Sequence, residues 1–335
     1  MRRYEGGSLG STPRIAVITN DALGNYVVAT PLLQALHREH PGAEIYYYSG
    51  PRTEELWRKD AHIAGGDSVF GVPPYASLTT ERPEFDLVVN VENAPFARAF
   101  AARIAGPETW VVGPIFDDEG RSDLTFSSDA RGDLWRDPEW TAADLPARYP
   151  FLQSGFIGEI FVRLAYLGGP IPPYEVFSEP TDTGCDLLIA MSASLPDKLW
   201  PEKAWMETLE MAKKAGLRVG LLGAAPSRQG KYWKGASAED RVVAEGLAED
   251  LRGRYSLPQV VGALGSARMV LTLDNGIMHL AASAKTPTIA LFRHDIDRLW
   301  TPPEGTIIPM VAPEEGIVSD IPPEPVQEEI SRVFG

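Results

Sequence analysis

The stretch MVLTLDNGIMHLAAS, residues 269–283, contains the change of pattern that decides the fold. Met269–Leu273 is a short apolar run, which is typical of a buried strand. The polar residues 274–276 interrupt the run, and a helix is expected over Ile277–Ala284. Another strand is expected at Thr288–Phe292. Strand, helix and strand in this order predict a parallel α/β sheet.

The same alternation precedes this stretch through most of the chain. Further strands are expected at Ile15–Ile18, Ile45–Tyr48, Phe85–Val89, Trp110–Val112, Asp186–Ala190 and Leu217–Leu222. A chain of 335 residues predicts two domains, since a domain has roughly 150 residues, and the Gly- and Pro-rich residues 168–173 mark the boundary. We therefore predict an α/β fold of two Rossmann-like domains facing a cleft. The expected parts are a flexible tail (1–12), an N-terminal domain (13–175), a C-terminal domain (180–322) and a terminal helix (323–335).

The amino-acid composition of the chain limits the kinds of partner that the protein is expected to bind. The chain has 31 Lys and Arg against 46 Asp and Glu, a net charge of −15, so its field repels nucleic acid and anionic membranes. Cys185 is the only cysteine, which excludes an internal disulfide and a zinc site built on cysteine pairs. No apolar run approaches the roughly 18 residues that span a bilayer, and no apolar segment follows the first residues. We expect a soluble, cytoplasmic protein without a transmembrane segment.

Ligands of parallel sheets bind where the strands end, so the loops after the strands are candidate sites. After the first strand, Asp21 and Asn25 flank a glycine that would let the backbone approach a ligand. After the strand at 186–190, Ser192, Ser194 and Lys198 could neutralise a diphosphate. The alternative for each loop is an ordinary turn with a surface lysine and capping serines.

Two later loops complete this set. Gly223 could let a nucleoside pack against the backbone, although its surroundings are also a common turn composition. Asp274, Asn275 and Gly276 open a helix whose N–H groups and dipole favour an anion. His279 lies on the first turn of that helix and could donate to a phosphate oxygen or a ribose hydroxyl. A lone histidine is more often a packed core residue, but its polar neighbours here favour a site.

Three motifs together resemble a known family. They are Gly24-Asn25 followed by Pro31-Leu32-Leu33-Gln34-Ala35-Leu36, then Lys198-Leu199-Trp200-Pro201, and Asp274-Asn275-Gly276-Ile277-Met278-His279-Leu280-Ala281-Ala282. The sequence is similar to glycosyltransferase family 9, the ADP-heptose:lipopolysaccharide heptosyltransferases. The resemblance implies the GT-B architecture and inverting transfer of a sugar, with the donor on the C-terminal domain and the acceptor mainly on the N-terminal domain.

The resemblance also implies roles for individual residues. Ser194, Lys198 and the backbone at Asn275 and Gly276 would hold phosphate oxygens, and Asp274 and His279 would complete that pocket. No metal and no cofactor besides the nucleotide-sugar co-substrate are implied, because a lysine and a helix N-terminus replace the cation that would offset the leaving-group charge.

One position departs from the family pattern. The family has an Asp after the glycine of the first loop, thought to deprotonate the acceptor, whereas this chain has Asn25. An amide cannot take up that proton. Either Asp21, the nearest carboxylate in sequence, substitutes, or the acceptor differs, or the chain is a non-catalytic sugar-nucleotide-binding homologue. A soluble acceptor and a nucleotide-sugar epimerase of similar build are further alternatives.

Other short sequence motifs are absent or lie in positions that argue against their usual function. Residues 6–10 have the Gly-x-Ser-x-Gly spelling of hydrolases, but no strand precedes them. Walker A and Gly-x-Gly-x-x-Gly patterns are absent, which disfavours P-loop and ordinary dinucleotide enzymes. Asp295 and Asp297 spell the Asp-x-Asp that some glycosyltransferases use for a divalent metal. Because they follow a late strand, we expect solvated loop residues or contacts to the donor sugar.

Overall fold

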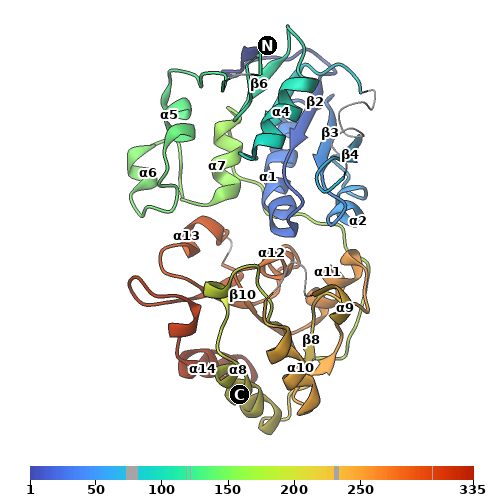
Figure 1. Ribbon diagram of the computed structural model, residues 1–335, viewed down its shortest axis with the longest axis vertical. Coiled ribbons are helices and arrows are strands. Elements are labelled where there is room, and N and C mark those ends of the chain that lie inside the picture. Colours follow the sequence, from blue (N-terminus) through green and yellow to red (C-terminus); the bar gives the residue numbers. More distant parts are fainter. Residues whose placement is uncertain (73–81, 118, 121, 230–233, 304) are drawn as a thin grey trace. The chain divides into compact units, whose positions relative to one another are not determined.

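The computed structural model describes residues 1–72, 82–117, 119–120, 122–229, 234–303 and 305–335 (Figure 1). The chain folds into two compact units, Met1–Glu175 and Val176–Gly335. Each unit has one six-stranded sheet whose neighbouring strands are all parallel. Among the described residues, no helix is long and apolar enough to cross a membrane.

The sheet of the N-terminal unit has the order β1-β6-β5-β2-β3-β4. Its strands are β1 (Arg2–Arg3), β2 (Arg14–Ile18), β3 (Glu44–Ser49), β4 (Gly65–Ser68), β5 (Leu87–Asn90) and β6 (Trp110–Val112). Its helices are α1 (Leu23–Glu39), α2 (Glu54–Trp57), α4 (Pro95–Ile104), α5 (Ala130–Arg136), α6 (Leu145–Arg148) and α7 (Ile157–Leu164). Because β5 pairs with β2 on the side opposite β3, the strand order reverses between β2 and β5.

The first residues are ordered where a flexible tail was predicted. Backbone N–H groups of Arg2 and Tyr4 donate to the carbonyls of Thr109 and Val111, both at 3.0 Å, which adds β1 to the edge of the sheet. The Arg3 guanidinium donates to the Gly113 carbonyl at 2.6 Å. The prediction is therefore wrong for residues 2–4, because their pairing is with a strand more than 100 positions away that local composition does not reveal.

Helix α1 begins earlier than its proline suggested. Pro31 lies inside Leu23–Glu39, although a proline is best tolerated in the first turn of a helix. The Thr30 hydroxyl donates to the Val27 carbonyl at 2.8 Å within this helix, a local bond of the kind by which threonine re-satisfies backbone in helices. Asn25 consequently lies in the first turn of α1 and not in the preceding loop.

The sheet of the C-terminal unit has the order β12-β11-β10-β7-β8-β9. Its strands are β7 (Leu187–Ala190), β8 (Val219–Leu221), β9 (Glu249–Asp250), β10 (Met269–Leu273), β11 (Thr288–Phe292) and β12 (Ile307–Val311). Numbered from β7, this is the order 3-2-1-4-5-6 of dinucleotide-binding sheets. The order reverses between β7 and β10, and ligands of such sheets bind where the loops diverge at that point.

The remaining elements of the C-terminal unit are helical. They are η1 (Pro196–Lys198), α8 (Glu202–Lys214), α9 (Pro226–Gln229), α10 (Ala236–Ala244), α11 (Leu257–Ser266), α12 (Gly276–Ser283), α13 (Asp297–Trp300), η2 (Val318–Asp320) and α14 (Pro323–Phe334). Every residue of β7, β10 and β11 is buried, as expected of parallel strands covered on both faces. The predicted α/β class with two Rossmann-like domains is confirmed.

Candidate functional site

The strongest candidate site lies where the strand order of the C-terminal sheet reverses. The loop after β7 leads to Ser192 and η1, and the loop after β10 consists of Asp274 and Asn275. The Asn275 side chain donates from Nδ2 to the Ser192 carbonyl at 3.0 Å. The two loops are thus joined directly at the position where parallel sheets bind ligands.

An ion pair occupies this junction. Lys198 Nζ lies 2.6 Å from Asp274 Oδ2, and the two side chains are 17% and 6% exposed. The same Nζ lies 3.4 Å from the Asp274 carbonyl oxygen. The sequence predicted both residues for one pocket, and the structure brings them into contact across 76 positions of the chain. This ion pair affects ligand binding, because an incoming anion must compete with Asp274 for the Lys198 ammonium.

Asn275 organises the start of α12. Its Oδ1 accepts the N–H groups of Ile277 at 2.9 Å and Met278 at 3.3 Å, so the side chain is the N-cap of this helix. Two of the N–H groups predicted to bind an anion are therefore occupied. For the Gly276 N–H no acceptor is found in the described part of the chain, which leaves this group and the helix dipole for a ligand.

His279 is enclosed in the first turn of α12. Its ring lies 5.7 Å from the Trp300 ring at an angle of 68°. Burial lowers the pKa of the imidazole to about 4; the Asp274 carboxylate opposes this shift and the Lys198 ammonium adds to it. The imidazole is therefore neutral near pH 7, so it can take part in hydrogen bonds at the site but adds no positive charge.

A buried carboxylate that the sequence did not single out lies behind Ser192. The Ser192 hydroxyl donates to Glu239 of α10, whose side chain is completely buried. Arg252 lies 3.3 Å from Glu239 and also bonds Asp250 at 2.9 Å. The signal that could have identified Glu239 is weak, because a Glu on a charged amphipathic helix usually faces water.

The other predicted donor residues lie along the same edge. Ser194 is exposed on the loop after β7. Gly223 lies just beyond β8, the strand next to β7, and its carbonyl accepts the Gly253 N–H at 2.9 Å. Both residues therefore lie in loops that follow neighbouring strands of this sheet.

In the N-terminal unit the corresponding reversal lies between β2 and β5. Asp21, in the loop after β2, accepts the Arg52 N–H at its Oδ1 at 2.8 Å. Burial raises the pKa of Asp21, and the hydrogen bond and charge of Arg52 act in the opposite direction. Asn25 lies four residues further along the chain, half-buried in the first turn of α1.

A second carboxylate at this reversal was missed. Glu92 follows β5, and its Oε2 accepts from Asn20 Nδ2 at 2.5 Å across the reversal point. Its Oε1 accepts the Ala94 N–H at 2.9 Å. A carboxylate three residues after a predicted strand is a readable signal, and the same reasoning that selected Asp21 could have selected it.

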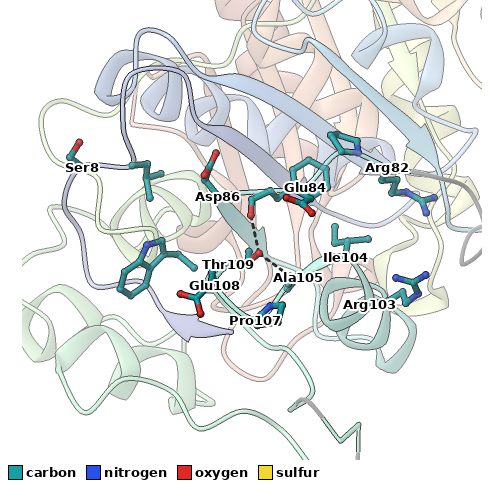
Figure 2. Close-up of a pocket in the computed structure, with 15 residues that line it drawn as sticks. Ser8, Arg82, Glu84, Asp86, Arg103, Ile104, Ala105, Pro107, Glu108 and Thr109 are labelled. Atoms are coloured by element: carbon teal, nitrogen blue, oxygen red, sulfur yellow. Dashed lines mark hydrogen bonds between the residues drawn. The ribbon is translucent and has the colours of Figure 1, made fainter.

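A cavity in the N-terminal unit lies away from these loops. It has a volume of about 960 Å³ and is lined at the amino ends of β5 and β6 by residues that include Asp86, Arg103 and Thr109 (Figure 2). The Thr109 hydroxyl donates to the Phe85 carbonyl at 2.8 Å there. Since ligands of parallel sheets bind at the carboxyl ends, this cavity is not the candidate site.

The Asp-x-Asp residues make local contacts. Asp295 accepts from Arg298 at 2.8 Å and lies 3.1 Å from His294 Nε2. Within the described ranges, no group of three or more His, Cys, Asp or Glu side chains is arranged to hold a metal ion. Arg298 thus supplies the positive charge that Asp295 contacts in this loop.

Part of the chain is similar in sequence to known proteins. Residues 180–319 match the family model for glycosyltransferase family 9 (heptosyltransferase). A segment of 120 residues, 36% of the chain, is 33% identical to lipopolysaccharide heptosyltransferase 1 of Salmonella typhimurium. That match spans 32%, about a third, of the length of this curated relative.

Solved structures share the fold over nearly the whole chain. The glycosyl transferase family 9 protein from Veillonella parvula has a TM-score of 0.71 at 14% identity, covering 96% of this chain and 97% of its own. The E. coli heptosyltransferase WaaC with ADP-2-deoxy-2-fluoro heptose has a TM-score of 0.65 at 16% identity, covering 95% and 99%. At these identities the likeness shows the fold.

Proposed function

We propose that this chain, whose residues 180–319 match the model of glycosyltransferase family 9, transfers a heptose-like sugar from a nucleoside-diphosphate donor to an acceptor hydroxyl. The transfer is inverting and needs neither a metal ion nor a cofactor. The C-terminal unit binds the donor and the N-terminal unit binds most of the acceptor. A related solved structure carries an ADP-heptose analogue, which makes an ADP-linked donor the first to test.

The observation that carries this proposal is the Lys198 ammonium held 2.6 Å from Asp274 at the opening of α12. A diphosphate leaving group gains negative charge as the sugar departs, and a fixed cation beside a helix N-terminus stabilises that charge without reorganisation. Lys198 and the Gly276 N–H together offer this environment, with Ser194 as a further donor; the Ser192 hydroxyl donates to Glu239. No divalent ion is required where these groups meet the charge.

Deprotonation of the acceptor hydroxyl needs a base, which belongs to the N-terminal unit in this proposal. In an inverting transfer the acceptor oxygen attacks the anomeric carbon, the bond to the diphosphate oxygen breaks, and the acceptor proton passes to a base. We assign this base to Asp21, since burial raises its pKa toward the working range. Glu92 is the comparison residue, because both of its oxygens already accept hydrogen bonds from Asn20 and Ala94.

One specific observation favours a second function. Asn25 stands where the family has a carboxylate, and Asp21 is already bonded to the Arg52 N–H. If Asp21 serves only to hold that turn, the protein is a sugar-nucleotide-binding homologue without transfer activity. It would then bind the donor and release neither sugar nor nucleoside diphosphate.

Binding and turnover distinguish the two functions. Thermal shift with ADP, UDP, GDP and CDP identifies the nucleotide, since a ligand that binds the folded state raises its melting temperature. Lys198→Met should abolish the shift, whereas Lys203→Met, which removes an exposed lysine of α8 paired with Glu207, should preserve it. Transfer of a labelled sugar in the presence of a chelator then tests activity and metal independence; binding without turnover supports the non-catalytic alternative, and an isomeric donor indicates an epimerase.

A further inference from the structure

The short turn that carries Lys198 is held by a second ion pair. Asp197, the preceding residue of η1, has its Oδ2 at 2.6 Å from an Arg293 terminal nitrogen. Arg293 directly follows β11, a fully buried strand paired on both sides with β10 and β12. The backbone from which Arg293 projects is therefore rigid.

The two ion pairs are made by consecutive residues of η1, whose separation is similar to the distance between neighbouring strands of the sheet. Asp197 reaches the residue after β11, and Lys198 reaches the residue after β10, Asp274. Neighbouring strands lie about 4.8 Å apart, and consecutive Cα atoms about 3.8 Å apart. Two consecutive residues of η1 can therefore engage the ends of two adjacent strands. The charges alternate, Asp with Arg and Lys with Asp, so the turn is favoured in this one orientation.

The second pair is partly exposed to water. Its side chains are 29% and 37% exposed, but Arg293 Nε and Asp197 Oδ1 are buried and have no hydrogen-bond partner among the described residues. The ion pair itself joins the other polar atoms, Arg293 Nη1 and Asp197 Oδ2. The contact thus links η1 to the residue that follows β11 through partly buried side chains.

Among the described residues, few other hydrogen bonds orient this part of the turn. Its backbone bonds are local, from Lys198 N to the Leu195 carbonyl at 3.2 Å and from Leu199 N to the Pro196 carbonyl at 3.1 Å. The next distant anchor is Trp200, whose indole N–H donates to the Ile321 carbonyl at 2.8 Å. A lysine has many rotamers, so a displaced turn would let its ammonium leave the start of α12.

We propose that Arg293 is a positioning residue that acts through Asp197 to fix Lys198 for the donor diphosphate. This inference rests on the proposed function, since it assigns Arg293 to the same site. Arg293 acts on the turn and not on the ligand, so its contribution to affinity depends entirely on Lys198. This dependence predicts how the affinities of double variants compare with those of the single variants.

The experiment measures the affinity for the nucleoside diphosphate that the wild type binds best, by calorimetry. We expect Arg293→Gln and Asp197→Asn each to weaken binding about tenfold, and their combination to weaken it no further than either alone. Arg218→Gln, which removes an Arg–Asp pair with Asp186 at the amino edge of the same sheet, should leave affinity unchanged.

The outcomes separate this inference from the proposed function. A further loss of affinity from Arg293→Gln in the Asp197→Asn background would overturn the inference, since Arg293 would then act on the ligand without Asp197. Wild-type affinity in Arg293→Gln, with or without a lower melting temperature, would also overturn it and leave the role of Lys198 intact. Failure of the wild type to bind any nucleoside diphosphate would refute the proposed function.

Discussion

Replacing Lys198 by methionine should destabilise the C-terminal unit even without a ligand. The variant leaves the Asp274 carboxylate, only 6% exposed, without its cation at 2.6 Å. At an effective dielectric constant of about 20, two charges at that separation attract by about 6 kcal/mol, most of which offsets the cost of removing both groups from water. Removing one partner of a buried pair typically costs 3–5 kcal/mol, and we expect about 3 kcal/mol because Lys198 retains some exposure.

The partner variant should behave differently. Asp274→Asn leaves an ammonium on a flexible four-carbon stem, which can turn toward water, so we expect a loss of only about 1 kcal/mol. The double variant Lys198→Met with Asp274→Asn leaves no unpaired charge and should recover most of the stability. Nucleoside-diphosphate binding should nevertheless stay absent in both variants that lack the lysine.

Urea unfolding followed by tryptophan fluorescence measures these free energies, and calorimetry follows the thermal transition. A loss of about 3 kcal/mol corresponds to roughly 6–12 °C for a unit of this size. Lys203→Met is the matched control, since its ion pair with Glu207 is largely exposed and contributes little. The reasoning is refuted if Lys198→Met is as stable as the wild type, or if the double variant is no more stable than Lys198→Met.

Three further predictions concern single residues. Asp21→Asn should lower the rate of transfer by about 10²–10⁴ with donor affinity unchanged, and Asn25→Asp in that background should restore part of it; an undiminished rate in radiolabel assays would exclude Asp21 as the base. Asn275→Ala removes the N-cap of α12 and should cost about 1–2 kcal/mol in urea unfolding, whereas no loss would contradict the capping role. His279 has a folded pKa of about 4 against 6.5 unfolded, so its contribution is present above pH 6.5 and is lost as the pH falls toward 4, by about 3 kcal/mol. Comparing pH-dependent unfolding of His279→Asn with the wild type measures this difference, and identical pH profiles would refute it.

Much of the fold could be predicted because parallel strands are locally encoded. Runs such as Met269–Leu273 are buried on both faces, so their apolar character is continuous and visible in a few residues. The start of α1 was harder, because Pro31 is a strong local signal that the tertiary packing overrides. The edge strand β1 could not be found at all, since two residues paired with a distant strand have no periodicity.

Part of the candidate site, too, could be predicted from the sequence, and part of it could not. The sequence by itself determined which residues follow the strands, because Lys198 and Asp274 stand in loops after apolar runs. Only the tertiary structure decided that these two side chains form one ion pair, that Arg293 holds the neighbouring Asp197, and that Glu92 meets Asn20. The physical reason is that secondary structure depends on neighbours three or four residues away, whereas charge pairing depends on the order of strands in a sheet, which joins residues that the chain keeps far apart.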